Sequence, residues 1–92
     1  MSDVCVRIPT ALRPFAGGAD EFNAAAGTVS EVLRQVTERH PLLTQRILTP
    51  EGRLRPFVNI FVDRRNVRGL QELATAVPPG AVLRILPAVS GG

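Results

Sequence analysis

The residues best placed to do chemistry in this 92-residue chain are the last ones, Gly91 and Gly92. They close the segment 88–92, which follows the last predicted strand and spans at most ~17 Å when extended. Glycine has no Cβ, so a Gly-Gly end can enter a narrow channel in another protein and approach it closely. We predict that the Gly92 carboxylate is the reacting group and that Val89, Ser90 and Gly91 thread into that channel.

A carboxylate must be activated before it can react further. Its carbonyl carbon resists nucleophiles and its oxygen leaves poorly, so a partner enzyme must first use ATP to form an acyl-adenylate. Sulfide or a persulfide can then displace AMP and leave a thiocarboxylate, a soft nucleophile tethered to the protein. We therefore expect ATP to be used by the activating enzyme, and no cofactor to be bound by the chain itself.

The other reactive side chains lack partners at useful spacing. Cys5 lies on a predicted strand and His40 at the far end of a predicted helix, so nothing pairs a nucleophile with a base. The carboxylates Asp20, Glu21 and Asp63 have no metal-ligand or acid/base spacing. We expect structural roles for all of them, with no catalytic residue, no metal site and no enzyme activity of the chain's own.

Charge and composition argue against a nucleic-acid partner. All 11 basic residues are arginine, so a pI of 11.0 accompanies a net charge of only +3, because no lysine titrates near pH 10. The densest basic cluster is Arg64, Arg65 and Arg68, and the chain has no tryptophan or tyrosine on which bases could stack. We expect this cluster to be a solvated surface.

Length and hydropathy predict one small domain. A chain of 92 residues and 9.9 kDa with one cysteine can form no internal disulfide, so packing must stabilise it. Its apolar runs are far too short to cross a bilayer, and it opens with no signal sequence. We expect a cytoplasmic monomer.

Four segments have the residue pattern of strands. Apolar residues alternate in the first and the last of them, the second can return along the first as a hairpin with a wide loop, and β-branched and aromatic residues fill the third. Pro9 and Pro14 are expected to break regular structure in the hairpin loop. The four predicted strands are 4–8, 21–24, 57–62 and 82–86.

One strong helix signal lies between these strands. Thr28 and Glu31 have the spacing of a capping box, an apolar stripe follows at helical spacing, and Pro41 ends it, which predicts a helix over 28–40. The segment 42–48 carries a weaker helical pattern. The segment 70–77 fits either a short helix or a short edge strand. The order predicts an α+β fold in which a mixed sheet wraps around one main helix, the β-grasp plan.

This plan divides the chain into a β-grasp domain, 1–87, and a C-terminal tail, 88–92. Alternation in the last strand predicts which of the domain's residues surround the tail. Charged Arg84 should face solvent, which places Val82 and Leu86 on the same outer face. Asn59 marks the outer face of the preceding strand in the same way, so that Phe57 and Phe61 face outward.

We predict that Phe61, Leu86 and Val82 form a contiguous apolar patch beside the tail, and that this patch and Arg84 dock the activating enzyme. The alternative is that a loop covers them.

Three segments together resemble a known family. They are Val4 to Pro9, Phe57 to Val62, and the C-terminal run Ile85-Leu86-Pro87-Ala88-Val89-Ser90-Gly91-Gly92. The chain is similar over nearly its whole length to the ubiquitin-like sulfur carriers of the ThiS/MoaD family. The likeness is closest to the CysO branch, because of Ile8-Pro9-Thr10 and the Leu-Pro-Ala-Val end before Gly-Gly.

The resemblance implies a specific set of partners. It implies adenylation and thiocarboxylation of Gly92 by an E1-like adenylating and sulfurtransferase enzyme, then sulfur delivery to an acceptor enzyme. That acceptor would be a PLP-dependent cysteine synthase, or a thiosugar synthase in natural-product biosynthesis. In the CysO branch a metalloprotease later frees the carrier from its cysteine adduct.

Two alternatives remain open at this point. The same adenylated terminus could form an isopeptide bond with a target lysine, which would make the chain a ubiquitin-like protein modifier. The chain could also be a small basic binding domain whose Gly-Gly end is incidental.

Overall fold

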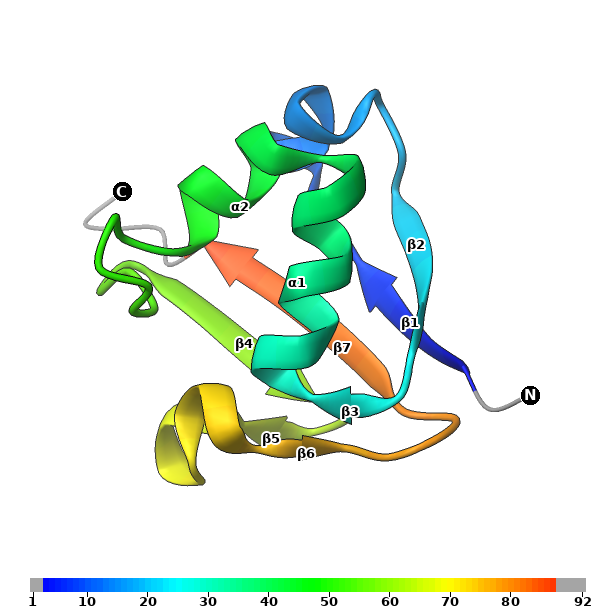
Figure 1. The fold of residues 1–92 in the computed structure, drawn as a ribbon, viewed down its shortest axis with the longest axis vertical. Coiled ribbons are helices and arrows are strands. Elements are labelled where there is room, and N and C mark those ends of the chain that lie inside the picture. The colour runs from blue at the N-terminus through cyan, green and yellow to red at the C-terminus, as the bar shows by residue number, and fades with distance from the viewer. Residues whose placement is uncertain (1–2, 88–92) are drawn as a thin grey trace.

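In the computed structural model of the chain, residues 3–87 are described, and they form a mixed β-sheet with two α-helices on one face (Figure 1). The strands are β1 (Asp3–Arg7), β2 (Glu21–Ala25), β3 (Gly27–Thr28), β4 (Val58–Val62), β5 (Arg65–Asn66), β6 (Ala76–Val77) and β7 (Val82–Pro87). The main sheet has the order β2-β1-β7-β4-β5, and β3 pairs with β6 separately. β1 and β7 run parallel in the middle, whereas the other pairs are antiparallel.

The first two strands form the predicted hairpin, paired antiparallel along their whole length. The loop between them differs from the prediction, because residues Thr10–Ala16 form a 3₁₀ helix, η1, that contains Pro14. Buried Leu12 and Ala16 anchor this helix against the core. The expectation that Pro14 breaks regular structure was wrong, since a short 3₁₀ helix held by packing accommodates it.

The main helix α1 spans Val29–Arg39, close to the predicted 28–40. The capping box is present: Thr28 Oγ1 accepts the Glu31 N–H at 3.2 Å, and Glu31 Oε1 accepts the Thr28 N–H at 2.8 Å. A Cβ added at Gly27 would lie 2.7 Å from that same Oε1, so glycine leaves room for the carboxylate. The local sequence therefore determines where α1 begins.

The two weak segments resolve into short elements. A second helix, α2, spans Pro41–Ile47, with Pro41 at its first position, where the missing N–H costs nothing. The segment 70–77 contains both predicted alternatives, a 3₁₀ helix at Glu72–Ala74 and then strand β6. In Figure 1, α2 lies beside the C-terminal end of α1, and β6 lies below its N-terminal end.

The core lies between α1 and the inner face of the sheet. Its side chains come from alternate positions of the strands and from the apolar stripe of the helix, and those that follow are at most 1% exposed: Val4, Val6, Ile60, Leu83, Ile85, Val29, Val32, Leu33 and Val36. The sheet curves around α1 (Figure 1). The predicted α+β fold, a mixed sheet wrapped around one main helix, is confirmed.

Candidate functional site

Strand β7 leads directly to the C-terminal segment, and its side chains alternate between two faces. Leu83 and Ile85 point into the core. Val82, Arg84 and Leu86 lie on the opposite, outer face, as the charge of Arg84 predicts. The outer face of β7 is therefore the exposed side of the strand that ends at the last described residue, Pro87.

The register between β4 and β7 decides what surrounds these side chains. Phe61 lies opposite Arg84, and Asn59 lies opposite Leu86. Val82 is four residues from Leu86, about 13 Å along an extended strand, with Arg84 between them. In this register Phe61 lies diagonal to both Leu86 and Val82, a separation that an aromatic side chain can bridge, so the apolar patch of these three residues stays a prediction.

Two large apolar side chains are exposed close to the end of β7. Leu86 is 44% exposed and Phe57, in the turn directly before β4, is 63% exposed. Phe61 is half-buried. Within residues 3–87 no loop covers Leu86 completely, so the alternative of a covering loop does not hold there. Leu86 and Phe57 therefore place exposed apolar surface where β7 ends and β4 begins.

Arg68 forms hydrogen bonds that hold the start of β4 in place. Its guanidinium donates to the carbonyl oxygens of Arg55 at 2.6 Å and Val58 at 2.7 Å, and to Asn59 Oδ1 at 3.2 Å. These bonds fix the start of β4 and the side chain opposite Leu86. Our sequence interpretation placed Arg68 in a solvated cluster. The polar Asn59 within an otherwise apolar strand was the one sign in the sequence of a side chain that accepts such a hydrogen bond on the outer face.

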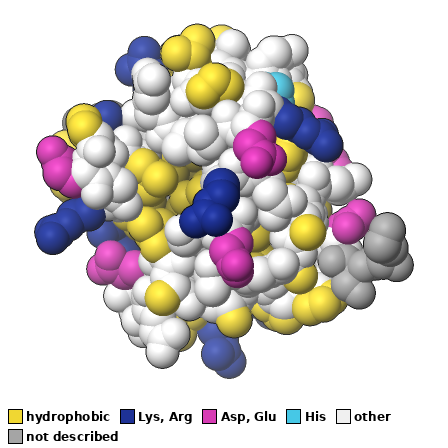
Figure 2. Space-filling view, in the orientation of Figure 1, with side chains coloured by type: hydrophobic (Ala, Val, Ile, Leu, Met, Phe, Trp, Pro, Cys, Tyr) yellow, Lys and Arg dark blue, Asp and Glu magenta, His cyan; other side chains and the backbone are white. Residues whose placement is uncertain are grey.

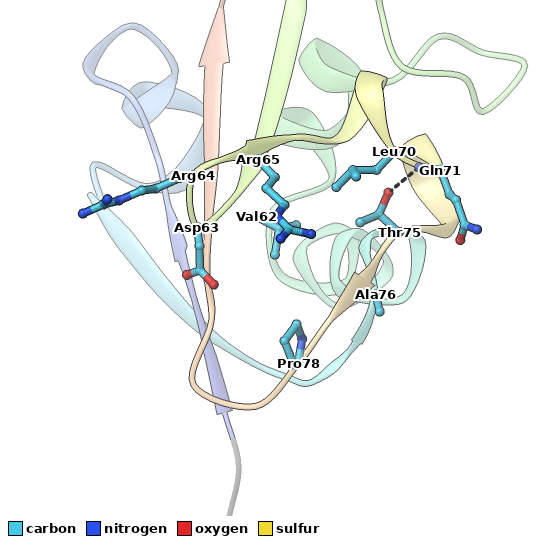
Figure 3. Close-up of a pocket in the computed structure, with 9 residues that line it drawn as sticks. All are labelled: Val62, Asp63, Arg64, Arg65, Leu70, Gln71, Thr75, Ala76 and Pro78. Atoms are coloured by element: carbon cyan, nitrogen blue, oxygen red, sulfur yellow. Dashed lines mark hydrogen bonds between the residues drawn. The ribbon is translucent and has the colours of Figure 1, made fainter.

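The other two arginines of that predicted cluster point elsewhere. A hollow of about 1030 Å³ lies at the opposite end of β7, beside the β4–β5 turn and β6. Arg65 extends into it, whereas Arg64 points away (Figure 3). With Arg68 bound to main-chain carbonyls, the predicted cluster forms no single basic surface.

A different basic pair is created by the topology. The parallel pairing of β1 with β7 places Arg7 directly beside Arg84, and both are exposed on the outer face. Our sequence interpretation missed this pair, because the two residues belong to opposite ends of the chain. Both the strand order and the register are needed to bring them together, and local sequence patterns give neither.

Cys5 and His40 lie on different sides of the sheet. Cys5 is on the outer face, where its Sγ donates to Glu21 Oε2 at 3.6 Å. Burial first, and then the Glu21 carboxylate, raise the pKa of the Cys5 thiol above its ordinary value. His40 joins α1 to α2, with its ring edge-on to buried Phe22 at 6.1 Å. The sheet therefore lies between Cys5 and His40.

Other predictions concern metals, membranes and the tail. Within residues 3–87, no group of three His, Cys, Asp or Glu side chains could hold a metal ion. None of the helices in that range has the length and apolar character needed to cross a membrane. The predicted reacting group on Gly92 and the threading residues Val89, Ser90 and Gly91 lie outside the described residues.

Known proteins resemble this chain along its whole length. Sulfur carrier protein CysO of Mycobacterium tuberculosis strain H37Rv is 39% identical over 92 residues, which cover 98% of this chain and 99% of the relative. The crystal structure of the Amycolatopsis orientalis BexX/CysO complex matches with a TM-score of 0.89 at 40% identity, over 97% of this chain and 99% of that one.

An archaeal protein with a different name has the same fold. The solution structure of small archaeal modifier protein 1 from Methanosarcina acetivorans matches with a TM-score of 0.82 at 31% identity, over 100% of this chain and 98% of that one. The fold alone therefore does not separate carriers from modifiers.

A mixed sheet around one main helix, shared with these proteins, defines a β-grasp, ubiquitin-like protein. The family profile described as "ThiS family" matches residues 6–92. The chain belongs to the ThiS family.

Proposed function

We propose that this protein is a sulfur carrier whose C-terminal Gly92 carboxylate is adenylated by an E1-like enzyme and then converted to a thiocarboxylate. The observation that carries the proposal is the 39% identity to a sulfur carrier over the full length of both chains. The family match, which runs to residue 92, includes the Gly-Gly end. The carriers, rather than the archaeal modifiers, give the higher identity.

Neither adenylation nor sulfur transfer at Gly92 uses a side chain of the folded domain. A Gly92 carboxylate oxygen attacks the α-phosphorus of ATP, and pyrophosphate leaves. Hydrosulfide then attacks the acyl carbon of the adenylate, and AMP leaves with the oxygen that was activated. The product is a thiocarboxylate at Gly92. Because both steps need an enclosed site in the activating enzyme, the chain acts as a co-substrate and not as a catalyst.

The folded domain supports this chemistry by presenting the tail. β7 pairs with β1 over residues 82–84 and with β4 as far as Pro87, so its end is held in the sheet by β4. We propose that Leu86 and Phe61 contact the activating enzyme beside its channel, with Arg84 and Val82 further along the same face. Phe57, exposed beside the end of β7, extends this docking surface.

After activation the carrier needs an enzyme that accepts the sulfur. A BexX/CysO complex exists for the Amycolatopsis orientalis relative, which supports a partner enzyme for this carrier as well. We propose a PLP-dependent cysteine synthase or a thiosugar synthase as the acceptor, and in the first case a metalloprotease that releases the carrier from its adduct. Activation consumes ATP, and we place the reactions in the cytoplasm.

The test is intact-mass spectrometry of the chain after incubation with an E1-like adenylating enzyme from the same genome, ATP and sulfide. We expect a mass gain equal to one oxygen replaced by one sulfur, and none when ATP is omitted. A higher-mass conjugate to a lysine of another protein would instead support the modifier. An unchanged chain with every such enzyme of the genome would contradict both.

A further inference from the structure

The basic pair on the outer face is costly to the fold. Arg7 and Arg84 are in register on adjacent parallel strands, which lie roughly 4.8 Å apart, and both are exposed. Like charges directly opposite each other destabilise a sheet. The other cross-strand neighbour of Arg84 is Phe61, which offers no compensating charge.

The acidic group nearest in register lies on the wrong side of the pair. Glu21 faces Arg7 across β1 and β2, on the side away from Arg84. Its Oε2 accepts a hydrogen bond from Cys5 Sγ. Arg84 therefore has an arginine on one side and an aromatic ring on the other, and the sheet supplies no carboxylate beside it.

A third arginine converges on the same place. Arg13, in η1, donates from its Nε to the Ile8 carbonyl oxygen at 3.0 Å, which fixes its side chain and leaves its other N–H groups available. Together with Arg7, Arg84 and Leu86, it lines a hollow of about 200 Å³. Three arginine residues from three separate segments thus line one small hollow beside the end of β7.

The position of the hollow decides whether these arginines can contact the ATP phosphates or only groups at the channel entrance of the activating enzyme. Gly92 is eight residues beyond Arg84, so an extended tail carries the reacting carboxylate ~26 Å away from the Arg84 Cα. No arginine side chain is that long. When the tail is inside the activating enzyme, the arginines face the rim of the channel and not the ATP phosphates.

We propose that Arg7, Arg13 and Arg84 form a recognition site for an acidic surface, made of Asp and Glu side chains, at the channel entrance of the activating enzyme. This inference rests on the proposed function and adds the chemistry of its partner. Guanidinium groups pair with carboxylates in two-point hydrogen bonds. A complementary charge also speeds encounter and orients the carrier so that its tail meets the channel.

The opposite side of the molecule provides a control. On the face that carries α1, positive and negative side chains lie next to one another and no basic cluster stands out (Figure 2). Arg34 is an exposed residue of α1. Arg34→Glu changes the net charge by the same amount as Arg84→Glu, but it lies in α1 and not on the outer face of the sheet.

The experiment measures kcat/KM for thiocarboxylate formation with the E1-like enzyme that charges the wild-type chain, at low and high NaCl concentration. We expect Arg84→Glu to lower kcat/KM about tenfold or more at low salt, mainly through KM, and Arg34→Glu to change it by less than about twofold. High salt should reduce the wild-type advantage. Arg84→Glu should also raise Tm by about 1–5 °C, because it removes the repulsion with Arg7.

The rise in Tm separates a recognition role from a structural one. If Arg84→Glu is converted to the thiocarboxylate as efficiently as Arg34→Glu, the recognition site is refuted while the carrier function stands. The same holds if Arg84→Glu is converted less efficiently but also has a lower Tm. If the wild-type chain is never charged by any such enzyme of its genome, the carrier function fails and the recognition site fails with it.

Discussion

The two faces of the main sheet are built from the same strands and have different roles. The inner face of β7 places Leu83 and Ile85 against α1, where both are at most 1% exposed. The outer face of the same strand carries Arg84 and Leu86 in solvent, and Arg84 stands beside a like charge. Alternate residues of one strand therefore serve stability on one side and partner recognition on the other. We expect changes on the two faces to have separable effects.

The largest expected effect lies beyond both faces. Deleting Gly92, or the substitution Gly91→Phe, should abolish formation of the thiocarboxylate. The first removes the reacting residue, and the second adds a side chain that cannot enter a narrow channel. The Tm of both variants should equal that of the wild type, since neither residue belongs to the core of residues 3–87. Mass spectrometry and thermal unfolding give the two readings. Normal thiocarboxylate formation by either variant would show that the Gly-Gly end does not have to enter a narrow channel.

On the inner face, Leu83→Ala should lower the free energy of unfolding by about 2–5 kcal/mol, because it leaves a cavity in a fully buried site. Denaturant unfolding measures the loss. At a temperature where the variant is still folded, its kcat/KM for charging should match the wild type. A large loss of charging in the folded variant would mean that the two faces are not separable.

On the outer face, Leu86→Arg should reduce kcat/KM for charging about tenfold, and should change the free energy of unfolding by less than about 0.5 kcal/mol. The matched control is Leu42→Arg, because Leu42 is also an exposed leucine, at 59%, but lies in α2. We expect the control to be charged normally. Equal charging of the two variants would remove Leu86 from the docking surface.

The smallest expected effect concerns the thiol on the outer face. Burial and Glu21 raise the pKa of the Cys5 thiol. The reactive thiolate therefore forms only at a pH higher than an ordinary cysteine requires. Alkylation of Cys5 by iodoacetamide near pH 8 should therefore be slower in the folded chain than in urea, and should accelerate as the pH rises. Faster alkylation of the folded chain would show an activated thiol.

Local patterns in the sequence were enough to predict most of the fold. The capping box of Thr28 and Glu31 and the alternation in the last strand are encoded by neighbouring residues, and the structure has both. The 3₁₀ helix around Pro14 was missed, because packing against the core and not local propensity holds it.

The site was predictable only in part, for a related reason. The outward direction of Arg84 and Leu86 followed from alternation, but their neighbours depend on strand order and register. Arg7 meets Arg84 only because the first and last strands pair in parallel, and Arg68 reaches Val58 only after the chain has turned back. Contacts of this kind join distant segments, so no spacing in the sequence reveals them.

Fragment mass spectrometry of the chain after sulfur transfer locates the sulfur and tests the carrier function directly. We predict one oxygen replaced by sulfur on the fragment that contains Gly92, with the Cys5 fragment unchanged. A whole sulfur atom added to the Cys5 fragment, with the C-terminal fragment unmodified, would show that this protein carries sulfur as a persulfide and would contradict the central claim.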